Sequence, residues 1–527
     1  MERRDREKST SQKLQCATFV KWILLRKILE NGIITAFLRL ICFKGGYMFV
    51  GREEQFKQLK DLWRKPVASL VTCRGRRRIG KSTLIAEFAK RNRVRFIKLE
   101  GLPPREGVTN DDQLQAFARQ LSEQTNTKYE PLTCWFDAFA RLDSLIDQRT
   151  KTVVLLDEIS WMGLFDINFP GELKYAWDNR FSKKNKLIVV LCGSVSSWID
   201  KNILKSKGFV GRPSLNLIIP ELSMQESYEF WLQQSKGSRI STHDIIDVLS
   251  VTGGVPKYLE SVDPFVGADE NIAKLCFNSG SLLLDEFNEI FDDALDQNLS
   301  FKKKILIALA LGAKTHSELS EALGVERSGF VTDNLEALEA AGFIARDEGL
   351  NPVNGKRTKQ AEYRICDNYT RFYLKYIEPS RSLIKRNAYR FMSVEQLPGW
   401  NSMLGLQFEA LVYNNMNLLL RWLGLDRTLL LSASPYQQRK TTRREGCQID
   451  LLLQTKHSIY VVEIKRRENI GEEVVSEVKE KIRRLKVTRG INVIPVLVYD
   501  GKLSKRVTAD GYFSRIISAA QLLGVED

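Results

Sequence analysis

The eight residues from Gly75 to Ser82 are the feature that most constrains how this chain can fold. They read GRRRIGKS and match the pattern G-x-x-x-x-G-K-[ST]. An apolar run at residues 67–73 precedes them and a helical pattern at residues 82–91 follows, so the segment joins a buried strand to the start of a helix. Loops of this kind cradle phosphates with successive backbone N–H groups and a helix N-terminus. The sequence therefore predicts a nucleotide-binding loop.

Two side chains of this loop have specific roles. Lys81 is expected to reach the β and γ oxygens and to act in catalysis, while the Ser82 hydroxyl ligates Mg²⁺. Serine or threonine can supply that hydroxyl. ATP and Mg²⁺ are thus the expected cofactors. The predicted ATP contacts are Gly75, Arg76, Arg77, Arg78, Ile79, Gly80, Lys81, Ser82 and Thr83.

A second apolar strand, residues 152–156, ends in two adjacent carboxylates. Asp157 is predicted to hold Mg²⁺ through its water shell, and Glu158 to orient and polarise the attacking water. A glutamate beside the magnesium aspartate favours hydrolysis over binding alone. A further strand, residues 187–192, is followed by Ser194, which is either a polar sensor of the γ-phosphate or part of an ordinary turn.

At 527 residues the chain exceeds the size of a single hydrophobic core, so we expect several domains. Near-continuous apolar runs separated by helical patterns predict an α/β class with a parallel sheet covered on both faces. The predicted domains are an N-terminal extension at 1–47, a P-loop core at 48–220, a helical lid at 221–298, a winged helix-turn-helix at 299–378 and a second α/β domain at 379–527.

The first 47 residues differ from the rest. Their two apolar stretches are shorter than the roughly 20 residues that a membrane span needs. An amphipathic anchor or a signal-like segment is one interpretation. We prefer the other, that translation begins at Met48, because the sequence from Met48 to Glu53 leads directly into an organised domain.

Composition narrows the partners. The formal charge of +16 favours polyanions such as nucleic acid, although a generally basic proteome would explain it as well. The eight cysteines and three histidines show no ligand-like clustering, which indicates neither a zinc site nor a disulfide framework. We expect a cytoplasmic protein with ATP as ligand, DNA or RNA as a possible partner, no membrane partner, and self-association left open.

Several short motifs are spread along the chain after Met48, namely FVGRE at 49–53, GRRRIGKS at 75–82, Asp157-Glu158, Gly193-Ser194, Gly211-Arg212, GGVPKYL at 253–259 and YRICDNY at 363–369. Through these motifs the chain resembles archaeal-type ATPases of the AAA+ and STAND group that carry a C-terminal nuclease-like domain of unknown function. That resemblance implies the P-loop core, the lid, the winged helix and the C-terminal domain. It also casts Arg212 as a γ-phosphate arginine, with a structural ion pair as the alternative.

The C-terminal domain carries a second candidate site. Asp450 and Glu463 lie on consecutive predicted strands, and Lys465 shares a strand face with Glu463. The spacing D-x12-E-x-K resembles the PD-(D/E)xK restriction-endonuclease-like fold, in which Glu409 falls where an extra acid is often found. Asp450 and Glu463, with Glu409, would hold Mg²⁺ that activates water, while Lys465 stabilises developing charge. Basic residues surround the motif, namely Arg439, Lys440, Arg443, Arg444, Arg466 and Arg467.

The predicted winged helix gives mixed signals. Its would-be recognition helix carries Asp333, Glu336 and Glu339 and no basic residue, which disfavours groove reading. Basic residues of the wing could still contact phosphates, namely Arg346, Lys356, Arg357 and Lys359. We therefore favour a packing or signalling module. Two hypotheses remain: an ATPase coupled to a metal-dependent nuclease, or a slowly hydrolysing regulatory switch with a silent C-terminal domain. The set of Asp450, Glu463 and Lys465 favours the first.

Overall fold

The computed structural model describes residues 49–193, 196–235, 241–291, 298–353, 356–357, 361–425, 430–438, 440 and 445–525. The predicted extension at 1–47 and the candidate sensor Ser194 lie outside these residues. Residues 50–527 form one compact unit.

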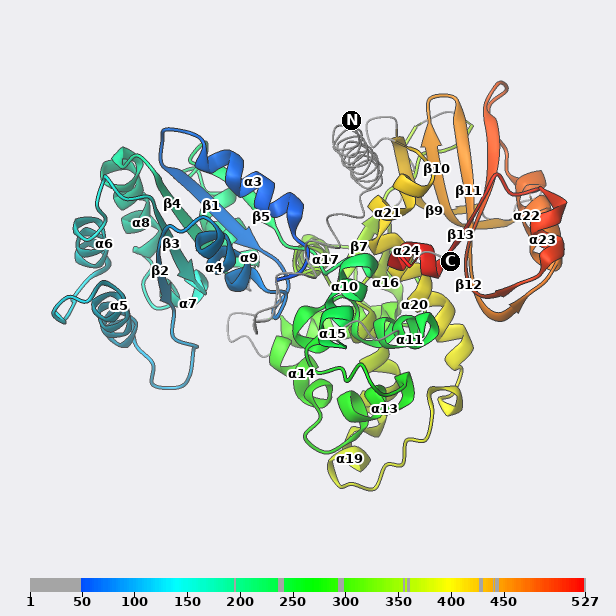
Figure 1. Ribbon diagram of the computed structural model, residues 1–527, viewed down its shortest axis with the longest axis horizontal. Coiled ribbons are helices and arrows are strands. Elements are labelled where there is room, and N and C mark those ends of the chain that lie inside the picture. The colour runs from blue at the N-terminus through cyan, green and yellow to red at the C-terminus, as the bar shows by residue number, and fades with distance from the viewer. Residues whose placement is uncertain are drawn as a thin grey trace, which may run out of the picture. The chain divides into compact units, whose positions relative to one another are not determined.

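Five parallel strands form the sheet of the nucleotide-binding core, in the order β2-β3-β4-β1-β5 (Figure 1). β3 and β4 are buried along their whole length, which is why both read as unbroken apolar runs. Because the strands are parallel, β1, which precedes the loop, and β3, which ends at Asp157, finish at the same edge of the sheet, with β4 between them. The strands are β1 (Ser69–Arg74), β2 (Arg95–Glu100), β3 (Thr152–Asp157), β4 (Leu187–Cys192) and β5 (Pro213–Ile218).

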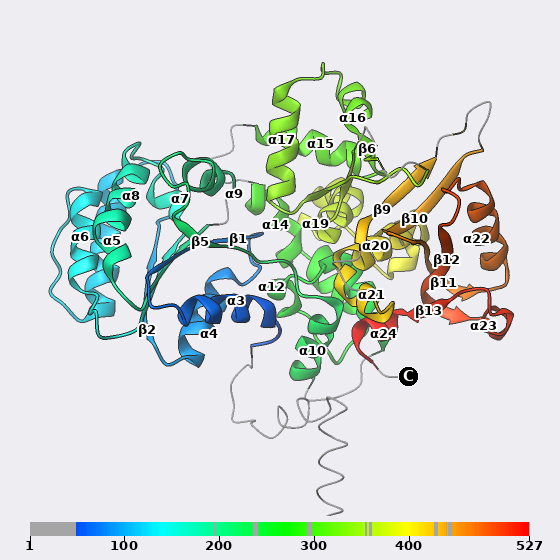
Figure 2. The ribbon, with the colours of Figure 1, turned by 90° about the horizontal axis from the view of Figure 1, so that it is seen from above.

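Helices cover both faces of this sheet, as Figure 2 shows. α3 (Glu53–Trp63) and α4 (Lys81–Arg91) lie on one face. On the other face, alternate strand residues pack into one cluster with α5 (Asn110–Thr125), α6 (Trp135–Ser144) and α8 (Phe169–Asn179). The short α7 (Ile159–Met162) and α9 (Ser196–Ile199) follow β3 and β4.

The described residues between 221 and 298, here called the lid, contain a series of helices. Ser223 and Glu226 form a capping box that starts the first of its helices, and Gly253, at φ 59°, ends the second. Pro256 occupies the first turn of the third helix. The helices are α10 (Met224–Gln234), α11 (Thr242–Thr252), α12 (Pro256–Leu259), α13 (Ala268–Ile272), the π-helical η3 (Ala273–Phe277) and α14 (Leu282–Phe291).

The next segment, here called the α15–β8 segment, contains three helices and a small antiparallel sheet of order β6-β8-β7. Thr315 and Glu318 form the capping box of its second helix. The elements are α15 (Leu299–Leu309), β6 (Lys314–Thr315), α16 (His316–Leu323), α17 (Gly329–Ala340), β7 (Ile344–Asp347) and β8 (Glu362–Ile365).

A second five-stranded sheet, of order β13-β12-β11-β10-β9, lies in the C-terminal region. β10 (Cys447–Thr455) runs antiparallel to its two neighbours, β9 (Leu430–Gln438) and β11 (Ser458–Ile470). β12 (Asn492–Leu503) and β13 (Arg515–Ser518) run parallel to β11. The helices are α18 (Asn368–Phe372), the π-helical η4 (Tyr373–Ile377), α19 (Glu378–Lys385), α20 (Trp400–Asn414), α21 (Met416–Trp422), α22 (Glu473–Arg484), α23 (Lys505–Asp510) and α24 (Ala519–Leu523).

Two expectations about the C-terminal region need correction. The sequence pattern at residues 405–422 predicts one helix, but the structure has two, because Asn415 leaves the helical path and accepts a hydrogen bond from the Met224 N–H at 2.7 Å. The pattern also predicts a strand at 449–453 with Asp450 at its start, whereas Asp450 lies inside β10. The other strands and helices predicted for described residues occur within a few positions of their expected bounds.

Candidate functional site

The predicted phosphate-binding loop connects β1 to α4 and closes on its own lysine. Lys81 is buried, and its Nζ donates hydrogen bonds to the carbonyl oxygens of Gly75 and Arg76, each at 3.1 Å. Gly75 has φ 148°, and a Cβ there would lie 2.5 Å from the Ile219 carbonyl oxygen. Gly80 has φ 87° immediately before the helix. Both glycines are therefore required by the backbone path that aims the loop N–H groups inward.

The two predicted magnesium ligands of this site lie together. The Ser82 hydroxyl donates to Asp157 Oδ2 at 2.6 Å; Ser82 lies in the first turn of α4, and Asp157 is the last residue of β3. A hydroxyl paired with a carboxylate is an oxygen donor set that suits Mg²⁺. Lys98 Nζ also lies 3.0 Å from Asp157 Oδ2. Nothing in the spacing of Lys98 marked it for this site, because only the pairing of β2 with β3 brings it there.

Glu158 directly follows β3 and is half-buried. Its backbone has φ 48° and ψ 50°, a left-handed conformation that costs free energy for any residue with a Cβ. Left-handed non-glycine residues are found preferentially at functional sites. The conformation is consistent with the predicted role in catalysis, which stays a prediction.

The three arginines of the loop direct their side chains away from it. Arg76 pairs with Asp367 and Glu221, Arg77 donates to the Glu289 carbonyl oxygen at 2.8 Å, and Arg78 pairs with Glu289 at 2.5 Å. Any contact of these residues with a nucleotide would therefore come from the backbone. Those contacts, and the contacts of Ile79 and Thr83, remain predictions.

Two glycines, Gly51 of the FVGRE motif and Gly254 of the GGVPKYL motif, allow close packing between the ATPase core and the lid. A Cβ at Gly51 would lie 2.2 Å from Glu226 Oε1, and one at Gly254 would lie 2.0 Å from the Leu222 carbonyl oxygen. Arg52 is buried, and its guanidinium donates to the carbonyl oxygens of Pro220 at 2.6 Å and Ile79 at 3.2 Å. These contacts tie the FVGRE motif to the back of the loop and to the strand-to-lid connection.

A cavity of about 260 Å³ lies beside the loop. Gly75, Arg76 and Ile79 line it from the loop, and Ile219 and Met224 are among its apolar residues. It also extends to the C-terminal ends of α17 and α20.

Arg212 forms a two-point ion pair with Asp178 of α8, with N–O distances of 2.6 and 2.8 Å. Hydrogen bonds from Arg212, followed by Lys174, lower the pKa of Asp178 to about 2. Arg212 therefore forms a structural ion pair, which was the alternative to a role as γ-phosphate arginine. A contact with the γ-phosphate stays a prediction.

The C-terminal candidates Asp450, Glu463 and Lys465 come together in the second sheet. Glu463 is fully buried and lies 2.8 Å from Lys465 Nζ. Asp450 Oδ2 accepts a hydrogen bond from the Ile464 N–H at 2.8 Å, which holds it next to Glu463. A second lysine, Lys481 of α22, lies 2.6 Å from Glu463 Oε2 and 3.7 Å from Asp450 Oδ1. The D-x12-E-x-K spacing missed Lys481, because it belongs to the following helix.

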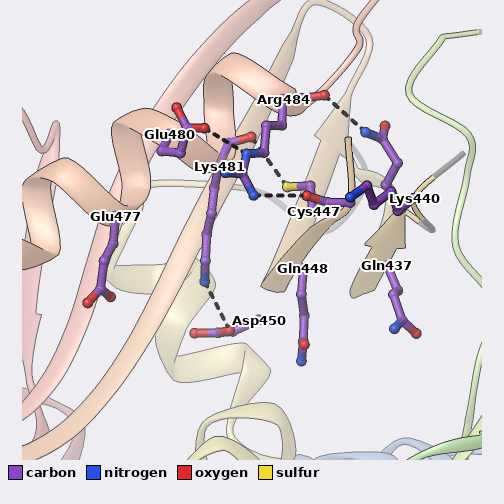
Figure 3. A pocket seen from close by; sticks show the side chains of 11 residues that line it. Gln437, Lys440, Cys447, Gln448, Asp450, Glu477, Glu480, Lys481 and Arg484 are labelled. Atoms are coloured by element: carbon purple, nitrogen blue, oxygen red, sulfur yellow. Dashed lines mark hydrogen bonds and ion pairs between the residues drawn. The ribbon is translucent and has the colours of Figure 1, made fainter. Parts of the chain in front are cut away.

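A cavity of about 790 Å³ opens at this site between β9, β10 and α22. Figure 3 shows Lys481 reaching from the helix toward Asp450, while Gln437 and Gln448 point into the same space. Asp450 and Lys481 line this cavity, together with Lys440 and Arg484. Glu477 and Glu480 line it as well, so the wall carries as many acidic as basic side chains.

Burial and neighbouring carboxylates raise the pKa values of Asp450 and Glu409. Burial and then the charge of Glu463 raise the pKa of Asp450 to about 6. Burial and then the charge of Asp450 raise the pKa of Glu409 to about 7, which places Glu409 near the pair. In the described part of the chain, no three His, Cys, Asp or Glu side chains are grouped so as to hold a metal ion. Metal binding by Asp450, Glu463 and Glu409 stays a prediction.

Glu221 offers a pH-dependent test of the polar cluster around Arg76. Burial and then the charge of Asp367 raise its pKa from 4.5 to about 7. The folded protein thus keeps this proton up to about pH 7, whereas the unfolded chain releases it near pH 4.5, so stability falls as the pH rises between those values. Glu221→Gln removes this loss. The difference in free energy of unfolding, variant minus parent, should rise by about 2 kcal/mol from pH 5 to pH 8 in urea titrations. An unchanged difference would show that the folded protein holds Glu221 ionised throughout.

None of the helices among the described residues has the length and apolar character needed to cross a membrane.

Comparisons with known proteins agree with the geometry of the loop. Residues 49–262 match the family model of an ATPase domain predominantly from Archaea. An uncharacterized protein of Methanocaldococcus jannaschii is 25% identical over 366 residues, which cover 69% of this chain and 76% of that protein. An uncharacterized ATP-binding protein of the same organism is 37% identical over 51 residues, which cover 10% of this chain and 86% of that protein.

Among solved structures, the Walker-type ATPase of Pyrococcus abyssi is similar to this chain with a TM-score of 0.45 and 18% identity. The similarity covers 64% of this chain and 99% of that one. The sequence matches and the loop at Gly75–Ser82 together show that this chain belongs to the archaeal-type ATPase family, with its ATPase domain at residues 49–262.

Proposed function

We propose that this ATPase couples its nucleotide state to a nuclease-like C-terminal domain that acts on nucleic acid in the cytoplasm. The observation that carries the proposal is the convergence of Asp450 and Glu463 with two lysines beside a cavity that Asp450 and Lys481 line. Such a cluster, in the same unit as an ATPase domain, needs an explanation beyond nucleotide binding.

The ATP half of the proposal rests on the loop and its two neighbouring strands. Backbone N–H groups of the loop would hold the phosphates, Lys81 would neutralise the β and γ oxygens, and Ser82 and Asp157 would hold Mg²⁺. Bound Mg²⁺ offsets charge on the phosphates. Glu158 would orient the attacking water. In the cavity beside the loop, Ile79, Ile219 and Met224 would supply apolar contacts to the base.

The element order of the α15–β8 segment supports a winged helix-turn-helix. Its third helix, α17, contacts α9 of the core, and Glu336 lies 3.8 Å from Lys205. An acidic helix that faces the ATPase domain supports a packing module over a groove-reading one. Of the wing residues expected to contact phosphates, Lys359 lies outside the described residues, and Arg346 and Arg357 approach Glu348.

The C-terminal order of helix, three antiparallel strands, helix and parallel strand supports the restriction-endonuclease-like assignment. Asp450 and Glu463 come from adjacent strands of that sheet. In this interpretation they hold Mg²⁺, which supplies an activated water, while Lys465 or Lys481 stabilises negative charge on the scissile phosphate.

A second candidate function, the regulatory switch, has its own observation. Both Lys465 and Lys481 already pair with Glu463, so a metal ion would have to compete with two ammonium groups. If the two lysines keep Glu463 paired and exclude the metal ion, the domain binds a partner without cutting it. Self-association and the identity of any nucleic acid stay predictions.

The test is a cleavage assay on the purified full chain with single- and double-stranded DNA and with RNA. We expect cleavage that needs Mg²⁺ or Mn²⁺ and changes in rate when ATP is added. Binding to the same nucleic acids should weaken steeply between about 50 and about 200 mM salt, because lysine and arginine contacts with phosphates release counterions from the nucleic acid. Binding without cleavage under either metal would favour the switch, and neither binding nor cleavage would remove the nucleic-acid proposal.

A further inference from the structure

The second residue of the phosphate-binding loop has its main chain and its side chain in different environments. The Arg76 carbonyl oxygen accepts a hydrogen bond from Lys81 Nζ at 3.1 Å, inside the nucleotide site. Its guanidinium leaves the loop and is buried, with 4% of the side chain exposed. One residue therefore joins the catalytic lysine to a distant part of the chain.

The guanidinium of Arg76 lies in a closed polar cluster. It pairs with Asp367, lies 3.2 Å from Glu221 Oε1, and donates to the Tyr258 hydroxyl at 3.1 Å. It also lies 5.3 Å from the ring centroid of Tyr258 and 5.8 Å from that of Tyr369. Burial alone would lower the pKa of Arg76, but Asp367 and the other acidic neighbours raise it, so the arginine is held charged. A lysine could not make this fork of contacts between aromatic rings.

Asp367 has a structural task of its own. Its Oδ2 accepts a hydrogen bond from the Thr370 N–H at 2.9 Å and so caps the N-terminus of α18. The next residue, Asn368, donates to the carbonyl oxygens of Leu249 at 3.3 Å and Gln407 at 3.2 Å. The same carboxylate therefore holds the loop arginine and starts the helix that joins the lid to α20.

We infer that Arg76 is a positioning residue for the nucleotide site, which makes ATP binding and the seating of α18 on Asp367 mutually dependent. The inference rests on ATP binding at the loop and is independent of the nuclease proposal. Lys81 Nζ has three N–H donors, two of which are on the Gly75 and Arg76 carbonyls, so turning donors to phosphate oxygens changes the hydrogen bonding of the peptide that carries the Arg76 side chain. Coupling between two sites is reciprocal, so whatever holds Arg76 also sets the affinity for ATP.

The direction of the effect follows from preorganisation. The cluster holds the Arg76 side chain in place, and with it the start of the loop, before any phosphate binds. A loop that is already ordered loses less entropy on binding than a free one. Weakening the cluster should therefore raise the KM for ATP and change kcat little.

Asp367→Asn tests this, because asparagine keeps the shape and caps a helix well but removes the charge that holds Arg76. We expect the KM for ATP to rise about tenfold, within the usual range of coupling between sites, with kcat within about twofold of the parent. Asp285→Asn is the matched control: it is the same change on lid helix α14, and its carboxylate pairs with Arg381 and Lys385. That variant should keep the parental KM.

A second measurement separates coupling from a static effect. Hydrogen exchange of the amides at residues 363–371 should slow when ATP and Mg²⁺ are added to the parent, and this change should be lost in Asp367→Asn. The inference would be overturned if folded Asp367→Asn has the parental KM, or if Asp285→Asn raises the KM equally. It would also be overturned if ATP does not change hydrogen exchange at these amides in the parent. If Asp367→Asn does not fold, Tyr258→Phe removes one partner of Arg76 and should raise KM about threefold; a parental KM there would also overturn it.

Discussion

Lys81→Ala will reduce ATP hydrolysis below detection and weaken ATP binding. Lys81 is buried in the loop and supplies the positive charge closest to the expected phosphate position. Removing one preorganised donor from a water-excluded site costs about a hundredfold to a thousandfold in rate. Phosphate release by the purified variant is the measurement, and hydrolysis at the parental rate would refute the assignment of the site.

Glu158→Gln is the companion variant, because it separates binding from turnover. The magnesium residues Ser82 and Asp157 remain paired, so nucleotide affinity should stay near that of the parent. The attacking water loses the group that polarises it, so turnover should stop. Weak nucleotide binding by this variant would instead show that the left-handed turn at Glu158 has a structural role.

The second large effect is expected at the C-terminal site. Asp450→Ala and Lys465→Ala should each remove nuclease activity, by about a thousandfold or more, because loss of a metal-bound water or its stabilising charge adds several kcal/mol to the barrier. ATP hydrolysis should stay close to parental, since neither residue contacts the phosphate-binding loop.

Lys479→Ala provides the control on the same helix as Lys481. Its ammonium lies over the ring of Tyr512, 4.9 Å from the centroid, away from the carboxylate pair. The control should cleave like the parent. If Asp450→Ala and Lys465→Ala both cleave at the parental rate, the activity comes from elsewhere in the chain or from a contaminant.

Strands buried on both faces could be predicted from the sequence. β3 and β4 are unbroken apolar runs because helices cover both sides of them. β5 and β13 were missed, because each pairs with a neighbour on one side only and alternates between exposed and covered positions. β9 is the edge strand of the second sheet and shows the same mixed pattern.

The local parts of both sites could also be predicted, but their long-range partners could not. Ser82 was identified from the pattern of the phosphate-binding loop, and Asp157 because it ends an apolar strand. Arg76 and Asp367 are 291 positions apart, and no spacing rule connects them. Lys481 was hidden for a related reason: it comes from the helix that follows the motif, and only the folded sheet brings it to Glu463.

The lid helix α11 has a consequence for how this chain is made. Every residue from Ile245 to Thr252 is buried, and the helix packs against α18, α20 and α24. Gln407 of α20 even donates to the Ser250 carbonyl oxygen at 2.7 Å. The ribosome delivers α11 well before these partners, so part of its apolar surface should stay uncovered until the C-terminal helices emerge. Exposed apolar surface favours aggregation, so we expect the nascent chain to be most prone to aggregation in that interval.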